Sequence, residues 1–492
     1  MGVLIMAIVM SIVVWLYFSH NPMNHSKAFL VRRFVNWFPL GLSYAFLYMA
    51  RYNLNVVKNA LGGDMNNTQF GLIFAAGTTT YALSFFINGP LVDRIGGKAG
   101  ILISTAGACV MNVAMGIITY MFLNGQLKGN LILWLAAVYS LNMYFQSYGA
   151  VSIIKVKAYW FHVRERGLFG AIFGTLLSFG IYFAFDWNAA ISKAVKSDLQ
   201  DPTMFQRFFV GTFGGGANGI DAVWWIFWIP AAFLAFWFVV DYFLIKDTPS
   251  EANYADFDTH DASSGDDREY SAMQLLHKVF THPVLLMVMA VEFTTGVLRN
   301  GILQWYSIYK AQVPQPGAEW IGDNWGLLLA ICGCFGGFAA GYISDSHFQS
   351  RRGPPVVLFG TIMALAGGAM AYALGTSPVT VAICGLLIAT LSISVHSLMS
   401  GTAAADFGGR KATGTAAGVT DAFVYFGTAI QSVSLGYLTA KDWAYWPVFL
   451  VPFALLGVVI AMRMWKSLPD ATKDYLARVE KVDLGGLTDR LK

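Results

Sequence analysis

The chain has 492 residues, of which 56% are hydrophobic and only 12% are charged. Soluble domains carry about 25% charged residues, so this composition excludes a soluble protein and predicts one that crosses a membrane many times. The net charge of +4 does not indicate nucleic acid as a partner, because basic residues in membrane proteins gather in cytoplasmic loops and set the topology.

All four cysteines lie within apolar runs, and none has the spacing of a metal or redox motif. Buried thiols of this kind usually behave as small core residues. We therefore expect no metal site and no cofactor. The cysteines are Cys109, Cys332, Cys334 and Cys384.

Residues 2–18 form an apolar run without a charge. A cleaved signal peptide would have a basic segment before this run and a small-residue cleavage site after it, and the sequence shows neither. We therefore expect residues 1–30 to be an additional N-terminal helix with a linker, kept in the mature protein.

Apolar segments of about 20 residues, the length that crosses the hydrocarbon of a bilayer, recur along the rest of the chain. Residues 31–245 hold six, near 36–58, 68–92, 99–122, 131–154, 167–186 and 222–245. Residues 283–466 hold six more, near 283–307, 322–344, 355–375, 378–403, 414–438 and 445–466. The predicted fold class is an all-α membrane protein with 12 transmembrane helices in two six-helix repeats, plus the extra N-terminal helix.

Two polar segments complete this plan. Residues 246–282, rich in Asp, Ser and Thr, separate the two halves, and residues 467–492 follow the last span. Most of the 32 lysines and arginines fall in segments that the plan puts on one side of the membrane. By the positive-inside rule, the linker and the tail are predicted to be cytoplasmic.

Two arginines lie inside predicted spans, Arg51 in the first span of the first half and Arg299 in the first span of the second half. A guanidinium keeps its proton at membrane depth, so it needs a partner or a water-filled cavity. We expect Arg51 and Arg299 to form an anion site.

The two halves also resemble each other in order, which indicates parallel repeats. The loop after the second span reads Gly-x-x-x-Asp-Arg-x-Gly-x-Lys and has a counterpart after the eighth span. This repeated loop resembles the signature of the major facilitator superfamily, and the resemblance implies the major facilitator fold. In it, the aspartate would accept charge-assisted hydrogen bonds and latch the cytoplasmic side in one of two states. The predicted gating residues are Gly89, Asp93, Arg94, Gly96, Lys98, Gly341 and Asp345.

Within that superfamily, the chain resembles the organophosphate:phosphate antiporter family over residues 44–465. Four blocks carry the resemblance: Arg-Tyr-Asn at 51–53, Phe-Gln-Ser-Tyr-Gly at 145–149, Leu-Arg-Asn-Gly-Ile-Leu-Gln-Trp at 298–305, and Arg-Lys-Ala-Thr-Gly-Thr-Ala-Ala-Gly at 410–418 with Tyr425. The resemblance implies that Arg51 and Arg299 grip the phosphate of either substrate.

Helical spacing places Tyr44, Tyr48, Arg51 and Asn55 on one face of the first span. We expect this polar face to line the substrate path. The resemblance implies that Tyr44, Tyr48 and Tyr425 border the ligand, with helix packing as the alternative for the first two. One turn before Tyr425 lies Asp421, for which ligand contact and an interhelical hydrogen bond remain open.

The chain departs from the family at two charged positions. Tyr52 stands where the family usually has lysine, and Gln304 stands where it usually has aspartate. The joint loss of opposite charges predicts that these positions face each other. Because several lining positions also differ, the resemblance does not identify the substrate.

Three further ionisable groups are candidates. Glu292 lies two turns before Arg299 on the same face, where it would pair with Arg299 or carry a proton; we favour pairing. Lys155 closes the fourth span and would attract anions at the cytoplasmic mouth, although the positive-inside rule also explains it. His396 has no carboxylate at helical spacing, so we expect a structural hydrogen bond rather than proton transport.

The function that the sequence favours is secondary transport: an organic phosphate ester and inorganic phosphate compete for one site and are exchanged by alternating access. Two alternatives remain open, a membrane sugar-phosphate sensor of the same family and a proton-coupled anion symporter. An enzyme is not expected, because no nucleophile–base pair or metal-spaced histidine cluster occurs in a span. We expect a monomer in the inner cell membrane, with multiple spans and no nucleic acid partner.

Overall fold

The computed structural model describes residues 2–214, 219–257, 272–348, 351–403 and 413–467. Parts of the predicted linker and tail, and Arg410 and Lys411 of the fourth resemblance block, lie outside these residues. Within the described residues the chain is helical and contains no strand.

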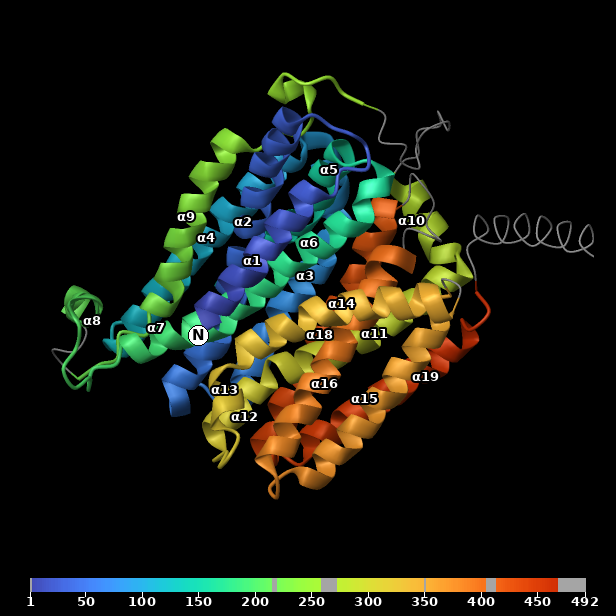
Figure 1. Cartoon of the computed structure of the whole chain (residues 1–492). Coiled ribbons are helices and arrows are strands. Elements are labelled where there is room, and N and C mark those ends of the chain that lie inside the picture. The colour runs from blue at the N-terminus through green and yellow to red at the C-terminus, as the bar shows by residue number, and fades with distance from the viewer. Residues whose placement is uncertain (1, 215–218, 258–271, 349–350, 404–412, 468–492) are drawn as a thin grey trace, which may run out of the picture.

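Each predicted span is a helix. The first half contains α2 (Lys27–Leu61), α3 (Asn67–Ile95), α4 (Gly97–Leu123), α5 (Leu131–Trp160), α6 (Val163–Tyr182) and α9 (Trp225–Leu244). The second half contains α11 (Pro283–Leu303), α14 (Trp325–His347), α15 (Gly353–Ala373), α16 (Pro378–His396), α18 (Thr413–Lys441) and α19 (Tyr445–Arg463). Figure 1 shows the blue-to-green helices of the first half packed beside the yellow-to-red helices of the second.

Two spans continue through a π-helical turn, and several short helices connect the others. The turn Phe183–Trp187 joins α6 to α7 (Asn188–Ala194), and the turn Ser397–Ala403 follows α16. The remaining short helices are α8 (Met204–Gly211), α10 (Ala272–Thr281), α12 (Trp305–Gln312) and α13 (Glu319–Asp323). Of these, α8 projects away from the bundle (Figure 1).

Local sequence sets the helix ends. The Ser26 side chain caps α2 by accepting from the Phe29 amide, and α2 stops at Gly62, whose φ of +55° suits glycine. A capping box between Asn66 and Gln69 starts α3. We call the end of the bundle at residues 62–66 the outer end and the opposite end, at Gly96, the inner end, following the charge-based prediction of topology.

Nine helices in the described residues are long and apolar enough to cross a membrane by length and composition, and α1 (Gly2–Ser19) is one of them. The set does not include α2, which carries the buried arginines Arg33 and Arg51 along its length. The predicted multi-span fold is thus confirmed. The helix that carries Arg51, α2, is among the least apolar of the predicted spans.

The helix α1 lies outside the twelve-helix core and packs against α6 and α2 (Figure 1). The Tyr17 hydroxyl donates to the carbonyl of Leu30, and Nε of Arg33 donates to Tyr17. Both terminal nitrogens of Arg33 bind Glu165 at 2.9 Å, which ties α2 to the start of α6. The prediction of an additional N-terminal helix is confirmed.

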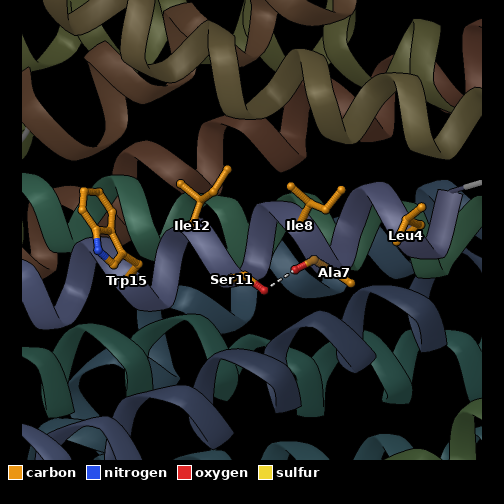
Figure 2. Close-up of a pocket in the computed structure, with 6 residues that line it drawn as sticks. All are labelled: Leu4, Ala7, Ile8, Ser11, Ile12 and Trp15. Atoms are coloured by element: carbon orange, nitrogen blue, oxygen red, sulfur yellow. Dashed lines mark hydrogen bonds between the residues drawn. The ribbon is translucent and has the colours of Figure 1, made fainter.

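The opposite face of α1 is apolar. A shallow hollow there is lined by six residues, whose one side-chain hydroxyl, that of Ser11, already binds the carbonyl of Ala7. In Figure 2 the side chains of Leu4, Ile8, Ile12 and Trp15 project from the same side of the helix. Because this hollow contains no charged group, it is no candidate for an anion site.

The halves meet along α3 with α18 and along α6 with α14. Near the outer end, Gly71 and Gly436 allow α3 and α18 to touch: a Cβ on Gly71 would lie 2.3 Å from the carbonyl oxygen of Ser432. Small residues at such crossings let membrane helices pack closely. The closely packed outer end leaves the candidate site at mid-depth, where Arg51 lies.

Candidate anion site between the halves

Arg51 is completely buried and is held by three side chains. Its Nε donates to Gln146 Oε1 at 2.9 Å, Nη1 donates to Tyr425 at 2.8 Å, and Nη2 donates to Tyr81 at 3.3 Å. Tyr425 belongs to the other half, so Arg51 bridges the halves. The guanidinium also lies over the rings of Tyr48 and Tyr81, at 4.9 and 4.6 Å from their centroids.

Arg299 occupies the corresponding place in α11 but has a different environment. It makes no hydrogen bond or ion pair within the described residues, although its neighbours along the helix are buried. Its exposed fraction of 9%, against 0% for Arg51, shows that solvent reaches part of this residue. A guanidinium with free donors and access to solvent is available to an anion.

Two tyrosines lie within electrostatic range of both arginines. Tyr48 of α2 stacks on Arg51 and also interacts with Arg299. Tyr425 of α18 binds Arg51 and interacts with Arg299. Both guanidinium groups therefore act on the same two tyrosines, and their joint role as an anion site stays a prediction. Tyr44 lies one turn inward, with its ring centroid 5.5 Å from that of Tyr48.

Glycines set the spacing of α11 and α18. A Cβ on Gly296 would lie 1.9 Å from the Val424 carbonyl oxygen, and one on Gly427 would lie 2.1 Å from that of Phe293. Only glycine permits this backbone contact. The contact fixes the spacing between α11, which carries Arg299, and α18, which carries Tyr425.

Outward from the arginines, hydrogen bonds join the halves at successive levels. The Tyr52 hydroxyl and the Gln304 amide both donate to Asn300 Oδ1, at 3.1 and 3.4 Å. One turn further, Asn55 donates to the Gln304 carbonyl, and the next turn brings Asn59 to the Ser307 carbonyl. Asn55, predicted to line the path, is thus engaged at the interface between halves, and its role in binding substrate stays a prediction.

The contacts continue to the outer end. Asn67 binds Gln312 and Thr439, and both carboxylate oxygens of Asp186 accept from the backbone amides of Gly326 and Leu327. These bonds close the outer side of the candidate site in this structure.

Inward from Arg299, the structure corrects one prediction. Glu292 does not pair with Arg299: its Oε2 lies 2.9 Å from Nδ1 of His396. The seven-residue spacing put Glu292 on the correct face, but two helical turns separate it from Arg299 by about 10 Å along the axis. His396 comes from α16, so no helical spacing could reveal this pair. The expected structural hydrogen bond of His396 is present.

Asp421 accepts a hydrogen bond from Ser400 at 2.5 Å and interacts electrostatically with His396, Glu292 and Arg299. Of the two alternatives for Asp421, the interhelical hydrogen bond is therefore present. Its half-buried side chain lies beside the Glu292–His396 pair, so ligand contact stays open.

Lys155 is not part of this group. Its ammonium binds Asp93 at 3.0 Å near the inner end, nine residues or about 13 Å along α5 from Gln146. The predicted latch at Asp93 therefore has a basic partner on a neighbouring span. Gly96, with φ of +88°, leaves room for Asp247, which caps the start of α4 by accepting from the Lys98 amide.

The remaining motif residues make fewer contacts. Arg94 is exposed, and a Cβ on Gly89 or Gly341 would meet nothing within 4 Å. The backbone of Asp345 lies in α14, while its side chain falls outside the described residues. The gating role of this motif stays a prediction.

Sequence reasoning missed two residues of the site. Tyr81 contacts Arg51, but several other polar residues share its span, so the sequence did not single it out. Gln146 lies in one of the resemblance blocks, where it was given no role. Because it belongs to another helix, α5, its position in the sequence gave no sign that it contacts Arg51.

Comparisons with known proteins find relatives over most of the chain. The chain is 23% identical to a probable hexose phosphate transport protein of Chlamydia trachomatis, covering 91% of this chain and 94% of that protein. It is 24% identical to the glycerol-3-phosphate transporter of Bacillus subtilis, covering 87% and 90%. It is also 22% identical to the membrane sensor protein UhpC of Escherichia coli, covering 86% and 89%. These relatives are consistent with the organophosphate:phosphate antiporter family.

Solved structures share the fold. A bacterial homologue of the human lysosomal transporter Spinster superposes with a TM-score of 0.62 at 13% identity, covering 90% of this chain and 98% of that one. The xylose transporter XylE of Escherichia coli superposes with a TM-score of 0.60 at 13% identity, covering 88% and 95%. The family model described as Major Facilitator Superfamily matches residues 40–432. The chain belongs to the Major Facilitator Superfamily.

Proposed function

We propose that the protein is a secondary transporter that exchanges an organic phosphate ester, of the glycerol-3-phosphate or sugar-phosphate class, for inorganic phosphate. The observation that carries the proposal is the pair of buried arginines, one from each half, which both interact with Tyr48 and Tyr425. The names of the relatives support the same substrate class.

The environments of the two arginines support exchange rather than simple binding. Arg51 is already fixed by Gln146, Tyr81 and Tyr425, whereas Arg299 has free donors. A phosphate bound to Arg51 would also accept forked, charge-assisted hydrogen bonds from Arg299, and these would draw the halves together. A bound anion joins the two halves through Arg51 and Arg299, so movement between states is easier when one of the two anions is bound. Alternating access of this kind would exchange one phosphate compound for another.

The outer closure described above is one of the two states that such a cycle requires. Its bonds are short polar contacts between the halves, from Tyr52 with Asn300 to Asp186 with the start of α14. A state open to the outside would break these contacts and bring the inner ends together.

The test is counterflow in proteoliposomes. Vesicles loaded with unlabelled phosphate should accumulate labelled phosphate, and external glycerol-3-phosphate or glucose 6-phosphate should compete with the label. Vesicles without internal phosphate are the control. Equal uptake with and without internal phosphate would contradict exchange.

A second candidate, a membrane sensor, is favoured by the likeness to UhpC. Its ligand site would be the same, because binding does not require flux. Phosphate-ester binding in detergent combined with no counterflow would support the sensor over the transporter.

A further inference from the structure

Glu292, His396 and Asp421 form a compact ionisable cluster from three segments of the second half, and the proposed exchange does not use them. Because α11 and α18 both run from the inner to the outer end, Glu292 lies two turns inward of Arg299, and Asp421 lies one turn inward of Tyr425. The cluster is therefore placed directly inward of the candidate phosphate site.

The cluster is incompletely paired. The Glu292 side chain is fully buried, and its Oε1 has no hydrogen-bond partner within the described residues. The His396 ring is 25% exposed, and the half-buried Asp421 has Ser400 as a hydrogen-bond donor. The backbone amide of Ser400 also acts on the Glu292 carboxylate. A buried carboxylate with so few donors is costly, so a donor brought by a ligand would stabilise it.

The charged groups that act on the cluster come from the helices packed around it. Arg299 of α11 acts on all three members, and Tyr48 of α2 interacts with Asp421. Arg299 is the one cation among these interactions in the described part of the chain. Two carboxylates thus face one arginine, and Arg51 adds the second positive charge of the site.

The outer closure decides where the organic part of an ester lies. With phosphate on the arginines, the space outward is filled by Tyr52, Asn300 and Gln304. The organic group must then extend inward, where Glu292, His396 and Asp421 lie. Carboxylates accept hydrogen bonds, so they suit a group that carries donors.

Charge balance adds a stronger requirement. With both carboxylates ionised and His396 neutral, the two arginines and two carboxylates leave the empty site with no net charge. A bound phosphate dianion then adds two negative charges beside Glu292 and Asp421, in a region screened little by water. A positive charge that enters with the dianion removes part of this repulsion.

We infer that the Glu292–His396–Asp421 cluster binds one positive charge together with each phosphate ester dianion. This charge comes from one of two sources: an ammonium group on the ester, bound by the carboxylates, or a proton taken from water onto the Glu292–His396 pair. The inference rests on the proposed function, since it assigns the phosphate to Arg51 and Arg299.

Two probes that differ at one group test the ammonium source. Glucosamine 6-phosphate carries an ammonium where glucose 6-phosphate carries a hydroxyl. At about pH 8 both esters are dianions at phosphate, whose second pKa is about 6. Titration of the amine of glucosamine 6-phosphate in the same buffer gives the fraction that carries the ammonium. If the ammonium is the source, the concentration of glucosamine 6-phosphate that half-inhibits phosphate exchange is at least about fivefold lower than that of glucose 6-phosphate. In Glu292→Gln or Asp421→Asn the difference falls below about twofold.

Proton uptake tests the other source. Purified protein in weakly buffered detergent solution, at the same pH, is mixed with glucose 6-phosphate and an indicator dye. The expected uptake is about one proton per bound ester, and it disappears in Glu292→Gln. The control for both measurements is Asp241→Asn, which changes a buried carboxylate bound to Ser43 in the other half and should leave both results unchanged.

The inference is overturned if the wild-type protein shows no preference for the amine and takes up no proton. If Glu292→Gln fails to fold, as judged by its melting temperature, the results for Asp421→Asn and for the wild-type protein still test the inference. The parent proposal is tested separately by counterflow of labelled phosphate. Loss of counterflow in the wild type contradicts that proposal, whereas normal counterflow without either effect contradicts only the inference about the cluster.

Discussion

The arginines of the two halves occupy corresponding positions, yet their surroundings differ. Arg51 has three hydrogen bonds from its guanidinium and two aromatic rings over it, and it is completely buried. Arg299 has free donors and carboxylates inward of it. The first half therefore holds its guanidinium in a fixed position, while in the proposed function a bound phosphate would complete the surroundings of Arg299. The two arginines occupy the same position in the repeat, but the helices packed around them give them different contacts and burial.

The largest expected effect comes from replacing either arginine with lysine. An ammonium keeps the charge but cannot form the planar, forked grip on phosphate, so Arg51→Lys and Arg299→Lys should each lower exchange more than about tenfold, a loss above about 1.4 kcal/mol. Initial rates of labelled phosphate exchange measure this. Exchange within about threefold of the wild type in either variant would contradict the assignment of that arginine.

The two lysine variants should also differ in thermal stability. Arg51→Lys leaves Gln146, Tyr81 and Tyr425 with fewer partners, so its melting temperature without ligand should fall. Arg299→Lys should leave that temperature nearly unchanged, because Arg299 makes no bond within the described residues. Equal destabilisation by both variants would show that the two environments are alike.

A smaller effect is expected from Tyr425→Phe, which removes one hydrogen bond to Arg51 across the halves. Hydrogen bonds to charged groups contribute about 1.5–3 kcal/mol, so the phosphate concentration for half-maximal exchange should rise about tenfold. Tyr306→Phe is a matched control, because the buried Tyr306 hydroxyl has no partner within the described residues. A similar rise in both variants would mean that the bond does not position Arg51.

Next in size is the coupling of Tyr52 and Gln304, one from each half. Both donate to Asn300 Oδ1, which supports the prediction that they meet. Tyr52→Lys and Gln304→Asp should each lower transport or expression, since each buries an unpaired charge. The double variant should recover a substantial part, with a coupling free energy above about 0.5 kcal/mol in a double-mutant cycle. Additive effects would show that the charges do not pair.

The smallest effect is expected far from the site, at the outer loop of the first half. Burial alone would raise the pKa of Asp221, but hydrogen bonds from Lys196 and Ser197 outweigh it and lower that pKa below its usual value. The carboxylate therefore stabilises the fold at neutral pH, and this contribution disappears as the pH falls below about 3.8.

At pH 7 the melting temperature of Asp221→Asn should lie about 1–2 °C below that of the wild type, because the pair is partly exposed. Thermal unfolding in detergent at several pH values measures the difference. A gap that widens under acid conditions would have the opposite sign and would exclude this account.

The sequence by itself determined the spans, the repeat and the two arginines. These follow from hydrophobic length and from the cost of charge in hydrocarbon, both of which act within one segment. The predicted face of Tyr44, Tyr48 and Arg51 was also accessible, because helical periodicity is local. The end of α2 at Leu61 lies close to the predicted boundary at residue 58, whereas α2 begins at Lys27, well before the predicted start at residue 36, because its first turns are polar.

Only the tertiary structure decided which groups meet across helices. The Glu292 partner proved to be His396, 104 residues away, and Arg51 proved to be held by Gln146 and Tyr425. Such contacts depend on helix crossings that glycines such as Gly296 and Gly427 set at the backbone. Periodicity states which face a residue occupies but not which helix that face meets, so the unequal environments of Arg51 and Arg299 required the fold.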